Sequence, residues 1–141
     1  MNSPDKHAAI RFQETIPSRM DKAEQLCLRV RKALSKNHLS RFCFPVELLT
    51  REAVSNALTH GNRNDATKSI ALELRMGRTW IRLQVSDEGE GFAWRRAVRN
   101  PGDADAITGR GLHLYALYAE RLQFNSCGNQ VTFWIHKDRK A

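Results

Sequence analysis

The sequence has little of what marks several large classes of protein. Its three cysteines are widely scattered and form no CxxC pair, so we expect neither a disulfide framework nor a cysteine metal site. No apolar run approaches the roughly 18 residues that cross a bilayer, and the first residues hold no apolar core of a signal peptide. We therefore expect one cytoplasmic, soluble domain over residues 1–141, with a loose tail at 1–7.

The chain is basic, with a formal net charge of +8. Much of the excess lies in residues 1–41, which hold nine Lys and Arg against four Asp and Glu. Such a balance can attract nucleic acid or an acidic protein. No zinc-finger spacing or aromatic RNA-binding signature accompanies it. A solvated basic surface is the commoner explanation, so we do not expect direct binding to nucleic acid.

Apolar periodicity predicts the order strand, two helices, two strands, loop, helix, two strands. Strands are expected at 8–16, 70–74, 80–87, 122–126 and 131–136, and helices at 18–36, 45–60 and 112–121. Ser18 with Asp21 is expected to open the first helix, and Gly61 to end the second in a left-handed conformation. Strands paired mainly as hairpins, with helices on one face, make a two-layer α+β sandwich with a mixed, mainly antiparallel sheet.

The second predicted helix carries polar residues at helical spacing. Glu52, Asn56 and His60 follow one another at intervals of four residues, so they lie on one face. Polar groups on a mostly apolar helix are costly unless something polar meets them. The pattern fits a solvated face, an internal hydrogen-bond network or a ligand site.

A first glycine loop, Asp87-Glu88-Gly89-Glu90-Gly91-Phe92, follows a predicted strand. Asp87 has the parity of the buried face of that strand, so it should point inward, where a carboxylate needs donors such as the exocyclic amine of a purine. Gly89 and Gly91 would let the backbone approach a ligand closely. The alternative is an ordinary turn at the end of a strand.

A second glycine loop, Thr108-Gly109-Arg110-Gly111-Leu112, precedes the last predicted helix. Free amides at a helix N-terminus, together with glycines and an arginine, suit an anion. The alternative is a hinge with an exposed arginine. Neither glycine loop completes GxGxxG, and GxxxxGK[ST] is absent, so neither a Rossmann site nor a P-loop is supported.

Taken in order, Glu52–Asn62 and the two glycine loops resemble the N, G1 and G2 boxes of the GHKL ATPase superfamily, which has the Bergerat ATP-binding fold. Within it, the helix and the run Val85–Phe92 look most like the anti-sigma-factor serine kinases. The resemblance implies ATP and Mg²⁺ as cofactors and a lid over the site at 93–108. It departs at Gly128-Asn129, where the family often has Gly-Thr, so the nucleotide preference stays open.

The resemblance also implies roles for single residues. Glu52 would polarise the attacking hydroxyl or water, Asn56 would bind Mg²⁺, and Asp87 would take the adenine amino group. The other implied ATP contacts are His60, Gly89, Gly91, Gly109, Arg110, Gly111, Leu112 and Asn129.

The function that the resemblance implies is that of an ATP-dependent protein serine kinase and anti-sigma factor. It would act by partner switching, phosphorylating a serine of an anti-sigma-factor antagonist. Histidine kinases need a further helical segment and gyrase-type relatives a transducer domain, for which we expect no room here. Family members resemble homodimers built through the first strand and helix, so we expect a homodimer.

Two alternatives differ in class from a kinase. One is a nucleotide-gated module that binds a sigma factor or antagonist without significant kinase activity. The other is a basic nucleic-acid-binding protein. Incubation with ATP and an antagonist tests the first, and salt-sensitive DNA binding stronger than ATP binding would favour the second.

Overall fold

The computed structural model describes residues 9–92 and 109–138. The strands are β1 Ile10–Pro17, β2 Ser69–Met76, β3 Trp80–Ser86, β4 Arg121–Phe124 and β5 Gln130–His136. The helices are α1 Met20–Lys36, α2 Cys43–Asn56 and α4 Gly109–Tyr118, with a 3₁₀ turn at Ser40–Phe42 and a π-helical turn at Ala57–Gly61. None of the described helices is both long and apolar enough to cross a membrane. The tail predicted at 1–7 and the lid predicted at 93–108 lie outside the described residues.

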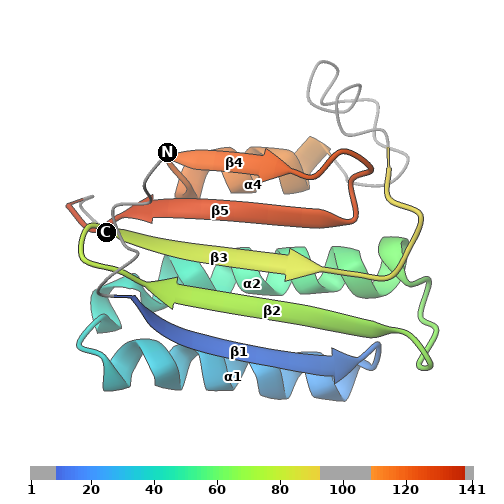
Figure 1. Cartoon of the computed structure of the whole chain (residues 1–141), viewed down its shortest axis with the longest axis horizontal. Coiled ribbons are helices and arrows are strands. Elements are labelled where there is room, and N and C mark those ends of the chain that lie inside the picture. The colour runs from blue at the N-terminus through green and yellow to red at the C-terminus, as the bar shows by residue number, and fades with distance from the viewer. Residues whose placement is uncertain (1–8, 93–108, 139–141) are drawn as a thin grey trace.

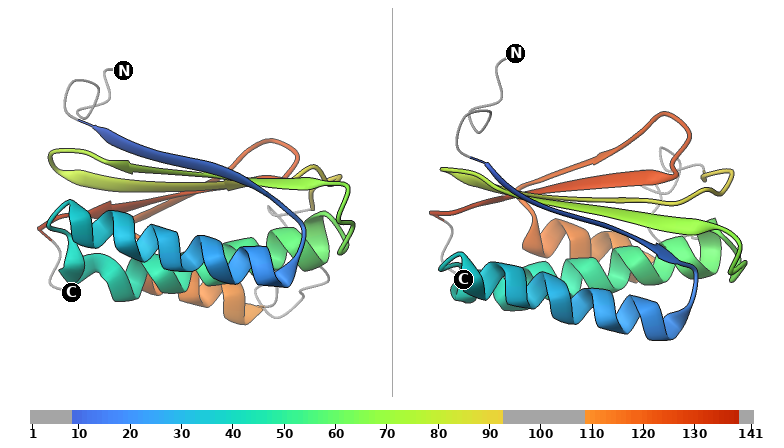
Figure 2. Two further views of the ribbon diagram at one scale, coloured as in Figure 1. Left: turned by 90° about the horizontal axis from the view of Figure 1, so that it is seen from below. Right: turned by 60° about the horizontal axis from the view of Figure 1, so that its bottom comes forward.

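The strands form one sheet in the order β1-β2-β3-β5-β4, and each pairing among the described strands is antiparallel. Figure 1 shows the sheet face-on with the helices behind it. Figure 2 shows that α1, α2 and α4 all lie on the same side of the sheet. The predicted α+β sandwich is therefore confirmed, with a sheet that is antiparallel throughout its described part.

The core fills the space between the sheet and the helices. Alternate residues of β2 and β3 are buried against it, as the period of two predicted. Burial of one such aliphatic side chain contributes about 1.5–3 kcal/mol. The strand β1 departs from the prediction, because Ile16 is buried but Ile10 is 50% exposed. Figure 2 gives the reason: the N-terminal end of this edge strand rises away from the helices.

Two predicted helix starts are wrong. The residue that precedes the first turn of α1 is Arg19 and not Ser18, although Asp21 does lie in that turn. The Ser18 hydroxyl instead donates a hydrogen bond to the Lys68 carbonyl at 2.8 Å. This bond links the end of β1 to the segment before β2. The helix α4 begins at Gly109 rather than at Leu112 and ends at Tyr118. Residues 109–112 of the second glycine loop therefore lie within α4.

The second helix does not reach His60 as one α-helix. It ends at Asn56 and continues as a π-helical turn, a feature frequent at functional sites. The predicted left-handed conformation of Gly61 is wrong, since the described glycines with positive φ are Gly91 and Gly128. Glycine is needed at position 61 for space: a Cβ there would lie 2.4 Å from the carboxylate carbon of Asp87.

Candidate functional site

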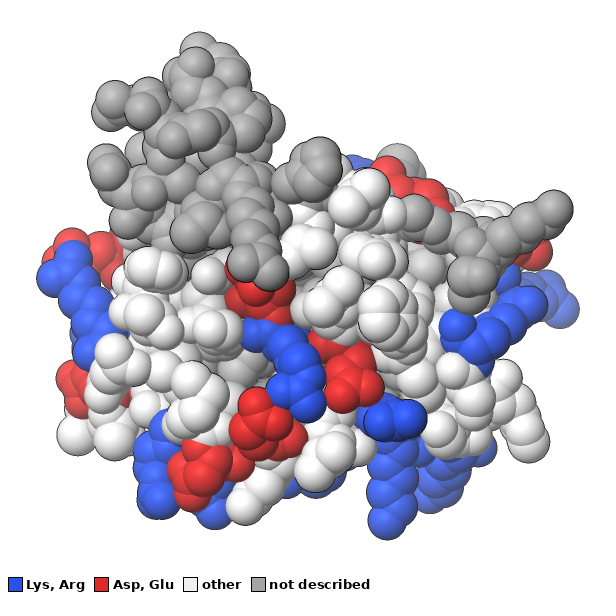
Figure 3. Space-filling model, turned by 180° about the vertical axis from the view of Figure 1, so that it is seen from behind, with Lys and Arg blue, Asp and Glu red and all other residues white. Residues whose placement is uncertain are grey.

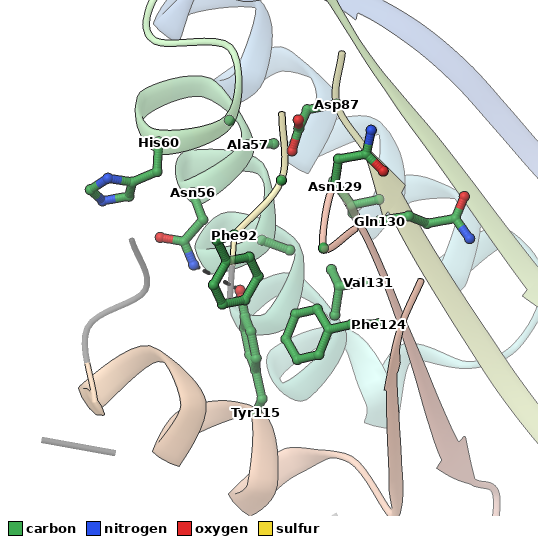
Figure 4. Close-up of a pocket in the computed structure, with 15 residues that line it drawn as sticks. Asn56, Ala57, His60, Asp87, Phe92, Tyr115, Phe124, Asn129, Gln130 and Val131 are labelled. Carbon is green, nitrogen blue, oxygen red and sulfur yellow. Dashed lines mark hydrogen bonds between the residues drawn. The ribbon is translucent and has the colours of Figure 1, made fainter. Parts of the chain in front are cut away.

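A cavity lies where α2, the end of β3 and the turn between β4 and β5 meet (Figure 4). Five residues predicted from the sequence line it, namely Asn56, His60, Asp87, Gly91 and Asn129. Apolar side chains of β3, β4 and β5 form its wall, among them Val85, Phe124 and Val131. The fold therefore brings the polar helix face and the first glycine loop together around one apolar space.

The carboxylate of Asp87 points into this cavity, as the strand parity predicted (Figure 4). One of its oxygens accepts a hydrogen bond from the Gly89 N–H at 2.8 Å. Burial raises the pKa of Asp87 above its ordinary value, and the Gly89 N–H and the charge of Lys68 offset part of the rise. A carboxylate can accept up to about four hydrogen bonds, so a ligand amine fits here.

Backbone packing determines where the carboxylate lies. A Cβ on Gly89 would lie 2.1 Å from the Gly61 carbonyl oxygen, and one on Gly91 would lie 1.8 Å from that of Cys127. Gly91 also has a φ of +83°, which side chains disfavour. Gly89 is not among the residues that line the cavity, and its close neighbour is the Gly61 carbonyl. Its lack of a side chain is needed for protein packing, and its predicted contact with ATP stays a prediction.

A hydrogen bond from α2 to α4 orients the Asn56 amide. Its Nδ2 donates to the hydroxyl of Tyr115 at 2.8 Å, and the amide oxygen points away from that hydroxyl (Figure 4). Tyr115 is only 1% exposed, and its ring meets Phe133 edge-on at 4.7 Å. An amide oxygen held this way fits a Mg²⁺ ligand. Tyr115 is not among the site residues predicted from the sequence; its hydroxyl at a core position of a predicted helix was the signal available.

Glu52 precedes Asn56 by one turn but lines a neighbouring groove instead of the cavity. This groove lies between α1 and α2 and also contains Cys27 and Arg51. Burial raises the pKa of Tyr115, and the negative charge of Glu52 raises it further. The charge of Glu52 therefore acts on the hydroxyl that holds Asn56, although Glu52 lines the groove and not the cavity.

The first glycine loop narrows the cavity, since Asp87, Gly91 and Phe92 all line it. Its volume is about 50 Å³, far below the roughly 300 Å³ or more of typical ligand sites. The Phe92 ring lies edge-on to the Phe124 ring, with 5.2 Å between the ring centres. The backbone N–H of Phe92 donates a hydrogen bond to the Cys127 carbonyl at 3.0 Å. The amide of Asn129 donates to the Gly89 carbonyl at 3.3 Å. A purine ring therefore enters only if this loop moves outward.

The second glycine loop can contribute backbone amides to the candidate site. Gly109, Arg110 and Gly111 are the first residues of α4 in the described part of the chain, and the N-terminal turn of a helix is a common site for an anion. The side chains of Arg110 and Leu112 lie outside the described part of the chain. Their predicted contacts with ATP therefore stay predictions.

Comparison with known protein families adds one finding. Residues 16–135 match the family model described as a histidine kinase-like ATPase domain. The matched span runs from the end of β1 into the end of β5 and includes every predicted site residue. A search of curated proteins finds no match.

Proposed function

The chain belongs to the histidine kinase-like ATPase family, and from this premise we propose that it is an ATP-dependent protein serine kinase that regulates a sigma factor. Membership implies ATP binding, usually with Mg²⁺. The observation that carries the proposal is the inward carboxylate of Asp87, which faces Asn56 across an apolar cavity. The resemblance of the run Val85–Phe92 to anti-sigma-factor serine kinases supports a serine as the acceptor.

Each side chain then has a role in binding. Asp87 accepts a hydrogen bond from the adenine amino group, and the apolar wall contacts the ring. The amide oxygen of Asn56 would hold Mg²⁺, which would neutralise charge on the phosphates. The amides at the start of α4 hold phosphate oxygens. Tyr115 is a positioning residue, because it acts only by orienting Asn56.

Glu52 is the proposed base for transfer. A serine hydroxyl of the antagonist approaches along the groove between α1 and α2, which Glu52 lines. The serine oxygen bonds to the γ-phosphorus while its proton passes to the Glu52 carboxylate. The bond between the γ-phosphorus and the bridging oxygen breaks, and ADP leaves. Partner switching follows because the phosphorylated antagonist has a different charge on its binding surface.

The direct test is incubation of the chain with ATP, Mg²⁺ and a candidate antagonist. Mass spectrometry should find one phosphate on a serine of the antagonist and none on the chain itself. Phosphate on a histidine, or release of free phosphate with no modified antagonist, would contradict the serine kinase proposal while leaving ATP binding intact.

A second candidate is a nucleotide-gated module that sequesters a sigma factor or antagonist without significant kinase activity. The position of Glu52 favours it, because this carboxylate lines the groove and not the nucleotide cavity. Capture of the partner that depends on ATP, with no phosphate transferred, would support this candidate.

Replacing Asn56 should separate metal-dependent from metal-independent binding. Asn56→Ala should lower the affinity for Mg-ATP about tenfold or more, because the Mg²⁺ contact is lost, and should change the affinity for ATP in EDTA much less. Isothermal titration calorimetry measures both. Tyr115→Phe is the matched control, since it keeps Asn56 but removes the hydroxyl that orients it, and its loss should be smaller. Unchanged Mg-ATP affinity in Asn56→Ala would remove Asn56 from the metal site.

Nucleotide binding should weaken at acidic pH. Burial raises the pKa of Asp87 in the free protein, whereas an adenine donor favours the charged carboxylate. At a pH below the raised pKa of Asp87, nucleotide binding therefore releases a proton, and the affinity falls as the pH falls. At a pH above this pKa, the affinity no longer depends on the protonation of Asp87. Calorimetry near about pH 5, above the ordinary value of about 3.9, in buffers of different ionisation enthalpy measures the proton. Asp87→Asn should abolish this release and keep any that comes from the phosphates.

We also propose a homodimer built through β1 and α1. The apolar stripe of α1 packs on the sheet of its own chain. Support for the dimer therefore rests on the outer edge of β1, which pairs with no further described strand, and on three exposed apolar residues, Ile10, Met20 and Leu28. Light scattering at tens of micromolar should give twice the chain mass, and less with Leu28→Gln. A monomer mass at that concentration would contradict the proposal.

A further inference from the structure

The face of the sheet away from the helices carries a row of arginines. Arg11 pairs in register with Arg75, Arg75 with Arg82, Arg82 with Trp134, and Trp134 with Arg121. The row thus crosses all five strands and, at about 4.8 Å per strand, spans roughly 19 Å. No described helix covers this face, which Figure 1 shows from the front and Figure 2 from the side.

Three of the four arginines of the row lie around one carboxylate, that of Glu73. Arg82 donates to it at 3.1 Å, while the Nε atoms of Arg75 and Arg11 lie 3.5 and 3.6 Å from its oxygens. Arg75 Nε makes no hydrogen bond among the described residues. Three guanidinium groups around one carboxylate leave an excess of positive charge. Because like charges in direct register destabilise a sheet, stability does not explain the row.

Aromatic side chains hold part of the row in place. The guanidinium carbons of Arg82 and Arg121 lie 5.9 and 4.8 Å from the Trp134 ring centre. They come from the strands on either side of β5, so the ring is flanked by cations. Trp80 meets His136 edge-on at 4.7 Å next to the row. Arginine and tryptophan are enriched in protein interfaces, whereas lysine is depleted there. The row contains both of the enriched residues and no lysine.

The distribution of charge over the helices differs from that on the exposed face of the sheet. In Figure 3, acidic and basic side chains lie next to one another over the helices. Arg51 there pairs with both Glu24 at 2.8 Å and Glu47 at 3.3 Å. Arg51 on the helix face is therefore neutralised by two carboxylates of its own, whereas three arginines of the row have one carboxylate between them.

We propose that the arginine row is the docking surface for a protein with an acidic surface. Charge complementarity selects such a partner. A second copy of the chain is disfavoured, because its own row would oppose like charges. A nucleic acid is disfavoured because bases need a free aromatic face, and arginines flank Trp134 on both sides. The proposal goes beyond the kinase function, since docking here needs no nucleotide.

The test uses the nucleotide-free full chain and a fluorescent peptide of about twelve alternating Glu and Asp residues, followed by anisotropy. Arg11→Gln/Arg121→Gln removes two exposed charges from the ends of the row and should lower affinity about threefold to tenfold. Arg31→Gln/Lys32→Gln removes the same charge from exposed positions of α1 and is the matched control, expected to change affinity less than about twofold. Glu73→Gln should act in the opposite direction and raise affinity.

Several results would overturn the proposal. Equal losses in the row variant and the control would mean non-specific attraction. A single-stranded oligothymidine that binds more tightly than the peptide, with the same dependence on the row, would assign the surface to nucleic acid. A change in the mass of Arg121→Gln alone in light scattering would assign the row to a second copy, since β4 lies at the sheet edge opposite to β1. Absence of peptide binding up to about 1 mM, the weak end of specific recognition, would also exclude acidic docking.

Discussion

Asp87→Asn should reduce nucleotide affinity about a hundredfold or more. The substitution keeps the shape of the side chain but replaces a charged acceptor by an amide. A hydrogen bond to a charged group contributes about 1.5–3 kcal/mol, and an amide nitrogen turned toward the adenine amine would add an unpaired donor. Together these effects correspond to roughly a hundredfold in the dissociation constant. Titration with a fluorescent ATP analogue measures the loss.

Stability should move in the opposite direction in this variant. A raised pKa of Asp87 means that the folded chain holds the proton more tightly than the unfolded chain does. The charged carboxylate therefore destabilises the fold above that pKa, so Asp87→Asn should unfold at the same temperature or slightly higher near neutral pH. Asp65→Asn is a control, because Asp65 caps a loop through Thr67 and lies outside the cavity. Intact affinity in Asp87→Asn would refute the proposed adenine contact.

Glu52→Gln should slow phosphate transfer about a hundredfold or more, because an amide cannot accept the serine proton. ATP affinity should stay within about twofold, since Glu52 does not line the nucleotide cavity. Single-turnover transfer to the antagonist measures the rate separately from binding. Retained ATP affinity together with lost transfer would distinguish a base from a structural residue.

Glu24→Gln is the matched control for this experiment. Glu24 lines the same groove as Glu52 and pairs with Arg51, but it belongs to α1. Its replacement should leave the transfer rate nearly unchanged. Equal transfer rates in wild type and Glu52→Gln would instead give Glu52 a structural role, with the serine proton lost to water.

Local periodicity was sufficient for much of the fold. Helices and strands have different repeats, so the order of the elements and the inward side of β3 could be predicted, and Asp87 with them. Helix ends were less predictable, because their determinants are distant. The Ser18 hydroxyl donates a hydrogen bond to the Lys68 carbonyl, and the carboxylate of Asp87 leaves no space for a side chain at Gly61. Residues adjacent in sequence to Ser18 and Gly61 indicate neither contact.

By itself, the sequence determined the α+β class, the polar face of α2 and the two glycine loops, because these depend on the spacing of residues along one segment. Only the tertiary structure decided which segments meet. It placed the Tyr115 hydroxyl against Asn56 and turned Glu52 toward a second groove. It also aligned the row that runs from Arg11 to Arg121. Such contacts depend on strand register and helix packing between residues far apart in the chain, and periodicity carries no information about either.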